Sequence, residues 1–130
     1  MSIYRFRLQS MQNAQCYVAI ETNDNGGVVS ATLVSYNTTV LKIYLEKGYP
    51  VMDCTGVYSV TTARHINRFT TEFCGRNLYH VCKDFVSHPH KYDSKNIALS
   101  VADWTQFLIQ CRRYLNNAFS QNVRKYFGKY

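Results

Sequence analysis

The stretch with the most potential for chemistry is 59–75, where polar and cationic side chains recur at helical spacing. Thr61, Arg64, His65 and Arg68 are separated by intervals of one to four residues. At ~100° per residue, such intervals place them on one side of a helix. Backbone N–H groups in the first turns of a helix favour phosphate, and an arginine can also contact a base edge. These four residues are therefore candidates for binding nucleic acid or another partner.

The same residues also allow a purely structural interpretation. Thr61 can help to cap the helix, His65 can pack at the edge of a sheet, and the arginines can simply be solvated. No named DNA-binding motif accompanies this helix, since no second helix precedes it as in a helix-turn-helix.

A second set of cations follows Asp103, after which the sequence contains no acidic residue. These cations alternate with aromatic residues, which suits a surface that grips a nucleic-acid backbone while rings stack on bases. The alternative is that they form the solvated side of an amphipathic helix. The candidates are Arg112, Arg113, Arg124, Lys125 and Lys129.

Neither a metal site nor an active site is expected. Cys74, His80, Cys82, His88 and His90 lie within seventeen residues, but no Cys-x2-Cys pair is present. The sequence also lacks a glycine-rich phosphate loop after a strand and a nucleophile elbow. We therefore expect a non-enzymatic protein without a metal or cofactor.

The charge is unevenly distributed along the 130 residues. Residues 1–60 contain four Lys or Arg and four acids, whereas residues 61–130 contain eleven Lys or Arg and four acids. The second half therefore carries the whole net charge of +7. This asymmetry predicts an anionic partner, either nucleic acid or an acidic face of a host protein that handles nucleic acid.

Cysteine usage and hydropathy indicate the compartment. The five cysteines are odd in number and not closely paired, and neither a signal segment nor a long apolar run is present. We expect a cytoplasmic protein with buried, reduced thiols and no membrane partner. The length predicts one domain over residues 1–130. The eleven tyrosines make a homodimer plausible.

The elements that must position these residues divide into two halves. Up to residue 57, apolar alternation and turn residues at 23–27 and 35–38 predict an antiparallel β-meander of four or five strands. From residue 58 the period changes to about 3.6, which predicts two or three helices. Such an order predicts an α+β fold with the helices packed on one sheet face.

Two helices are predicted in most detail. The first begins after Ser59 and ends before Gly75, with Glu72 on the outer side beside the arginines. The last begins at a capping box, Ser100 to Asp103, and is expected to continue to about Tyr126, or ~39 Å. Its expected apolar face consists of Val101, Trp104, Leu108, Cys111, Leu115 and Phe119, with Gln106, Gln110, Arg113, Asn117 and Arg124 opposite.

Two blocks of sequence resemble a known group of proteins. The blocks are Ser35-Tyr36-Asn37-Thr38-Thr39-Val40 and Tyr58-Ser59-Val60-Thr61-Thr62-Ala63-Arg64-His65-Ile66-Asn67-Arg68-Phe69. Together, over about residues 30–73, they resemble small uncharacterised proteins of tailed phages and prophages with the pattern SYxT … YSxTTxxHixxF. The resemblance implies an intracellular phage accessory protein, and it supplies no activity.

These observations give two functional hypotheses. The first is a phage-type accessory protein whose basic helical half binds nucleic acid. The second is an anti-CRISPR-like protein that binds and inhibits a host anti-phage defence nuclease.

Overall fold

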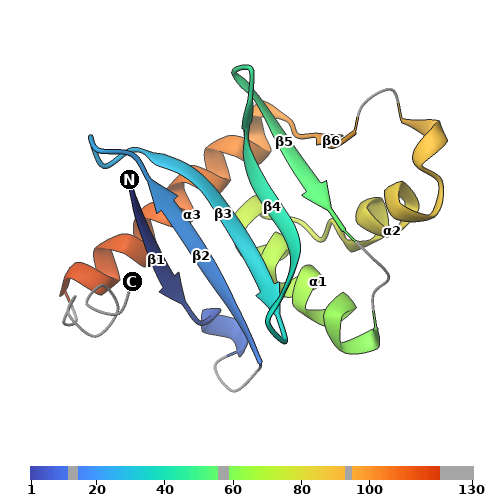
Figure 1. The fold of residues 1–130 in the computed structure, drawn as a ribbon. Coiled ribbons are helices and arrows are strands. Elements are labelled where there is room, and N and C mark those ends of the chain that lie inside the picture. The colour runs from blue at the N-terminus through green and yellow to red at the C-terminus, as the bar shows by residue number, and fades with distance from the viewer. Residues whose placement is uncertain (12–14, 56–58, 93–94, 121–130) are drawn as a thin grey trace.

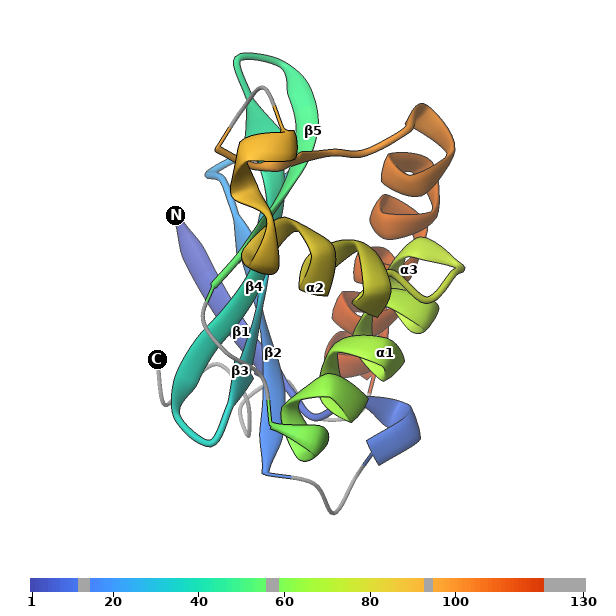
Figure 2. The ribbon, with the colours of Figure 1, turned by 90° about the vertical axis from the view of Figure 1, so that its right-hand side faces the viewer.

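The computed structural model contains a six-stranded antiparallel sheet with helices on one side of it (Figures 1 and 2). It describes residues 1–11, 15–55, 59–92 and 95–120, and of residues 118–120 only the backbone. The predicted α+β fold is therefore confirmed. None of the helices in these ranges is long and apolar enough to cross a membrane.

The first five strands form the predicted meander, and each pairs with its neighbours in the sequence. They are β1 (Ser2–Phe6), β2 (Cys16–Thr22), β3 (Val28–Ser35), β4 (Thr38–Glu46) and β5 (Tyr49–Cys54). A sixth strand, β6 (Ile97–Ala98), was not expected. It comes from the helical half of the chain and pairs with Val51 and Met52 of β5.

Local turn chemistry sets the register of the meander. Between β2 and β3, the Asn23 carboxamide oxygen accepts from the Gly27 N–H at 2.9 Å, and Gly26 has a φ of 80°. Between β3 and β4, Tyr36 and Asn37 have φ values of 50° and 67°. Two consecutive positive φ angles are typical of the tight turns whose twist matches that of paired strands.

The helices are α1 (Val60–Cys74), α2 (Tyr79–Ser87) and α3 (Val101–Ser120), with short 3-10 turns η1 (Gln9–Met11) and η2 (Pro89–Lys91). The Ser59 hydroxyl accepts from the Thr62 N–H and caps α1, and Gly75 ends α1 with a φ of 77°. Both predicted ends of α1 are therefore confirmed. The expected extension of α3 to Tyr126 lies outside the described residues.

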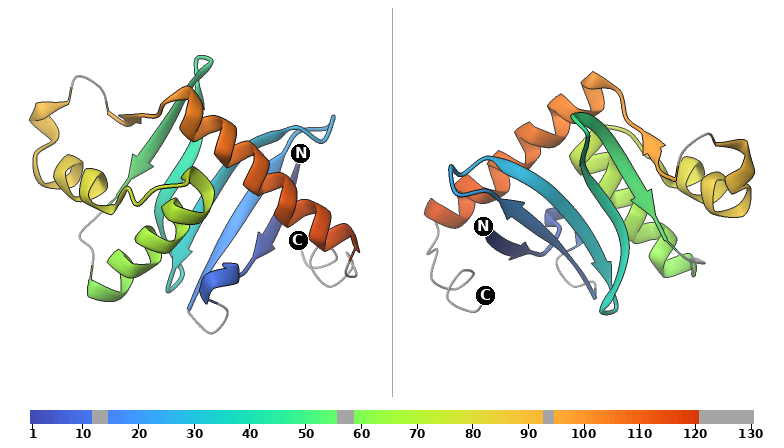
Figure 3. Two further views of the ribbon diagram at one scale, coloured as in Figure 1. Left: turned by 180° about the vertical axis from the view of Figure 1, so that it is seen from behind. Right: turned by 45° about the horizontal axis from the view of Figure 1, so that its top comes forward.

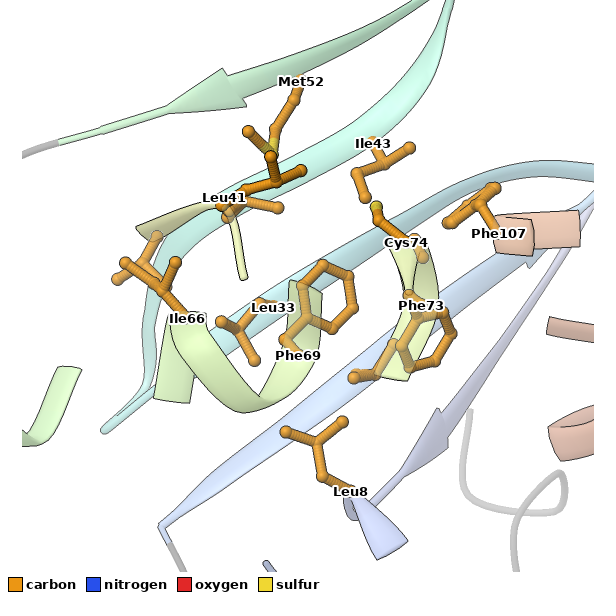
Figure 4. Close-up of a cluster of buried hydrophobic side chains, with 14 of the residues drawn as sticks. Leu8, Leu33, Leu41, Ile43, Met52, Ile66, Phe69, Phe73, Cys74 and Phe107 are labelled. Carbon is orange, nitrogen blue, oxygen red and sulfur yellow. The ribbon is translucent and has the colours of Figure 1, made fainter. Parts of the chain in front are cut away.

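The core lies between the sheet and the layer formed by α1 and α3 (Figure 3, left; Figure 4). Phe69 and Phe73 of α1 are fully buried, and their ring centroids are 4.7 Å apart. Phe73 also contacts the Tyr114 ring of α3 at 5.2 Å. Around them lie Leu8, Leu33, Leu41, Ile43, Met52, Ile66 and Phe107 (Figure 4).

An ion pair fixes the start of α3 to the end of α1. The Arg76 guanidinium donates through Nε and Nη2 to the two Asp103 carboxylate oxygens, at 2.9 and 2.8 Å. Asp103 also accepts from the Ser100 N–H, and Ser100 Oγ accepts from the Asp103 N–H. The predicted capping box is therefore present, and Arg76 and Ser100 hold the pKa of the Asp103 carboxyl at about 2.

Replacing Phe69 tests the aromatic core. Phe69→Ala should lower the free energy of unfolding by about 3–5 kcal/mol, because it removes a buried ring and leaves a cavity. Urea denaturation measures this loss. Val60→Ala, at a position in the same helix that is 79% exposed, is the control and should change stability by less than about 0.5 kcal/mol. Equal effects of the two substitutions would contradict this account of the core.

Asp103 should make stability depend on pH in the acid range. Because its pKa is depressed on folding, its contribution is complete above about pH 4 and is lost as the pH falls towards 2. Asp103→Asn should cost about 1–3 kcal/mol near neutral pH and reduce this acid dependence. Denaturation at several pH values measures both effects. An unchanged pH profile would show that the ion pair contributes nothing.

Candidate nucleic-acid interface

Packing of α1 on the sheet determines which of its side chains face outward. Ile66, Phe69 and Phe73 are buried against the core. Arg64 and Arg68, one helical turn apart, are exposed, on the side that the helical period places opposite this face. The expected pair of outward-facing arginines is therefore present on α1.

The charges of these two arginines are not paired with a carboxylate among the described residues. The ion pairs within the described ranges involve the N-terminal amine, Arg76, His88 and Lys91, and neither Arg64 nor Arg68 lies within 4.0 Å of a carboxylate there. An exposed cation without a carboxylate partner leaves its N–H groups to water or to a ligand. Among the described residues, no carboxylate therefore compensates the two guanidinium charges of α1.

The acidic residue of α1, Glu72, is half-buried and forms hydrogen bonds with η1 and α3. Its Oε1 accepts from the Tyr114 hydroxyl at 2.6 Å and lies 3.5 Å from Gln110 Nε2, and its Oε2 accepts from Ser10 Oγ at 2.7 Å. Burial and this bond to Glu72 raise the pKa of Tyr114. The expectation that Glu72 faces outward with the arginines is wrong, because hydrogen-bond donors from η1 and α3 draw it into the helix interface.

The His65 imidazole is also placed differently from the prediction, since its exposed fraction is 1%. Its Nδ1 lies 2.8 Å from the hydroxyl of Ser35, at the end of β3. Burial, and then the nearby Arg64 charge, lower the pKa of His65. The expectation that His65 faces outward is therefore wrong. Instead, it joins α1 to the sheet through a buried polar contact.

This contact brings together residues of the two sequence blocks described above, 35–40 and 58–69. The Ser35 hydroxyl lies 3.5 Å from Thr62 Oγ1, which in turn lies 3.1 Å from the Ser59 cap. The Tyr36 ring centroid is 5.9 Å from that of His65. These hydroxyls and the imidazole therefore form a polar cluster that orients the first turns of α1.

Thr61 lies beside this cluster and is half-buried in the first turn of α1. Its position on α1 is compatible with the predicted contact to a ligand, because the first turn leaves backbone N–H groups without helical partners.

The two described arginines of α3 point to different sides. Arg112 donates to the Gly26 carbonyl in the β2–β3 turn. Arg113 Nη1 lies 3.4 Å from the Gln110 carboxamide oxygen, on the side of α3 that meets Glu72 of α1. Arg113 can therefore extend the cationic surface of α1, whereas Arg112 cannot. The candidates Arg124, Lys125 and Lys129 lie outside the described residues.

The Cys and His residues of 74–90 do not converge. Cys74 and Cys82 are buried, whereas His80, His88 and His90 are exposed. Over the ranges that the structure describes, no three His, Cys, Asp or Glu side chains form a group that could hold a metal ion.

Sequence reasoning missed the contacts that support α1 from other elements. Ser10, Gln110 and Tyr114 have no feature in the sequence that links them to Glu72. Ser35 does have one, since it belongs to the first of the two sequence blocks, 35–40, and pairing that block with the block of His65 indicates the contact.

Comparison with known proteins gives one finding. Residues 6–88 match a protein family that is described as a family of unknown function, DUF8033. The match begins at the last residue of β1, includes β2 to β5, α1 and α2, and ends before α3. At a stringent level of significance, no curated protein and no solved structure matches the chain.

His65 should make stability depend on pH near neutrality. Its pKa is depressed on folding, so the unfolded chain binds the proton more readily than the folded one. The contribution of the neutral imidazole is therefore complete above about pH 6.5 and falls as the pH decreases below that value. Thermal unfolding between about pH 7.5 and 5.5 should show a falling midpoint.

His65→Gln should flatten this dependence, and His80→Gln is the matched control because His80 is exposed on α2. If the unfolding midpoints of both variants depend on pH with the same slope, the buried imidazole is not the group responsible for the pH dependence.

Proposed function

The chain belongs to the DUF8033 family of unknown function, and we propose that it is a non-enzymatic protein that binds nucleic acid through α1. The observation that carries the proposal is the pair Arg64 and Arg68, exposed on α1 and without a carboxylate partner among the described residues. Two guanidinium groups about 6 Å apart along a helix can contact successive phosphates of a backbone.

Two further side chains can contribute to the binding surface formed by Arg64 and Arg68. Thr61 lies one turn before Arg64, and Arg113 adds a third guanidinium on the side of α3 that faces Glu72. Because Glu72 is held by Tyr114 and Ser10, its charge is directed inward. The residues of the proposed interface are Thr61, Arg64, Arg68 and Arg113.

The recognition should be electrostatic and independent of sequence. Guanidinium groups on a convex helix bind phosphate oxygens, which are the same in every sequence. The resemblance of residues 30–73 to tailed-phage and prophage proteins supports an accessory role in the cytoplasm of the host cell.

A double substitution tests this interface. Arg64→Ala with Arg68→Ala should weaken binding to a mixed-sequence DNA duplex about tenfold at roughly 0.1 M salt, since each exposed ionic contact contributes about 0.5–1 kcal/mol. The slope of log K against log salt should also decrease by about 2, because two phosphate contacts are lost. Fluorescence anisotropy over a salt series measures both quantities.

The matched control is Lys83→Ala with Lys95→Ala, which removes the same charge from exposed positions outside α1. This control should retain most of the affinity and the slope. If the two double variants weaken binding equally, the attraction reflects net charge alone and α1 is not the interface.

A second candidate function is inhibition of a host defence nuclease by protein contact, as in an anti-CRISPR protein. It is favoured by the β4–β5 hairpin, where Leu45 is 45% exposed and Tyr49 is 74% exposed. Large apolar side chains at a hairpin tip are typical of protein contacts. This function requires no nucleic-acid binding near 0.15 M salt and a complex with a purified nuclease that Tyr49→Ser weakens.

A further inference from the structure

Two cysteines from different elements lie next to each other at the edge of the core. Cys54 is the last residue of β5, and Cys82 lies in the middle of α2, beside that end of the strand (Figure 1). Their Sγ atoms are 2.9 Å apart, although 28 residues separate them in the sequence. Both side chains are buried, and neither cysteine is in a disulfide.

At this distance the two thiols are in direct contact, with Cys54 Sγ donating to Cys82 Sγ. The sulfur atoms of a disulfide are about 2.0 Å apart, so bond formation requires an approach of about 0.9 Å. We expect this movement from α2, a nine-residue helix whose buried residues are Cys82 and Phe85. Its start is held by the Leu78 N–H, which donates to Thr70 Oγ1 at 3.0 Å, and by the Tyr79 N–H, which donates to Asn77 Oδ1 at 2.9 Å.

The other cysteines are poorer reaction partners. Burial, and then the Asp103 carboxylate, raise the pKa of Cys74 to about 12. Burial also raises the pKa values of Cys16 and Cys111. Since the thiolate is the reactive form, a raised pKa makes these three thiols less reactive at neutral pH. Cys74 is the alternative partner for Cys82, because the two are close enough to interact electrostatically.

We propose that Cys54 and Cys82 form an oxidisable dithiol, which a hydroperoxide converts into an intramolecular disulfide. This site is independent of the proposed nucleic-acid binding. Cys54 has an exposed fraction of 9% and Cys82 of 0%, so a small oxidant reaches Cys54 first.

The reaction has two balanced steps. In the first, the Cys54 thiolate attacks one peroxide oxygen, the O–O bond breaks, and hydroxide leaves and is protonated to water. In the second, the Cys82 sulfur gives up its proton and attacks the sulfur of the Cys54 sulfenic acid, which releases a second water. Overall, two thiols lose two electrons and two protons, and hydrogen peroxide is reduced to two waters.

The disulfide would close a loop of the chain that contains the whole of α1. A cross-link of this length restricts the unfolded chain, so the oxidised protein should unfold at a higher temperature than the reduced one. It would also fix α2, whose buried residues are Cys82 and Phe85, to the end of β5.

The experiment treats the folded, reduced full-length chain with hydrogen peroxide and measures its intact mass and free thiols. The wild type should lose about 2 Da and two of its titratable thiols while remaining a monomer. Peptide mapping should then identify a cross-link between Cys54 and Cys82. Retention of all five thiols, or a cross-link between other cysteines, would overturn the proposal.

Two variants test whether the disulfide forms between Cys54 and Cys82 and not with a neighbouring thiol. Cys74→Ala, a matched change at the neighbouring buried thiol, should still lose about 2 Da. Cys82→Ala should instead stop at the Cys54 sulfenic acid, with a gain of about 16 Da and capture by dimedone. An intramolecular disulfide in Cys82→Ala would contradict the assignment, and the wild-type result remains decisive if this variant does not fold.

Discussion

The arrangement of the molecule depends on the contact of the α1 phenyl rings with the sheet and with α3. Phe69 and Phe73 stack on each other, and Phe73 also contacts Phe107 and Tyr114. Buried rings of this size dominate the packing energy of a small domain and leave a helix only one favourable rotation about its axis. That rotation fixes the direction of every other side chain on α1.

The polar contacts at the two ends of α1 are consistent with this rotation. Near its start, His65 meets Ser35, and near its end, Glu72 meets Tyr114. Both polar groups are satisfied by partners outside α1, so their burial does not oppose the packing. Arg64 and Arg68 are the charged side chains that this rotation directs to solvent.

Features that depend on near neighbours were predictable from the sequence. Strand alternation with Asn23–Gly27 predicts the β2–β3 hairpin, and Ser59 and Gly75 predict the ends of α1. The outward positions expected for His65 and Gln110 are wrong, because their partners lie far away in the sequence, whereas the alternative that His65 packs at the sheet agrees with its contact to Ser35. The buried face of α3 includes Phe107 and Tyr114, because both rings pack against Phe73 of α1. This face leaves Val101 79% exposed. Two residues of β6 are too few to show a period.

The exposed positive charge of the helical half depends on which groups its carboxylates contact. Glu72 accepts from Tyr114 and Ser10, Asp84 from Tyr92, and Asp103 from Arg76 and Ser100. Each described carboxylate of this half is therefore engaged by neighbouring groups. Glu72 and Asp103 join the end of α1 to α3 and η1, and Asp84 contacts Tyr92 and Lys91, so none of the three pairs with the guanidinium groups on the outer side of α1. The same contacts that position the helices thus leave the cationic side of α1 uncompensated.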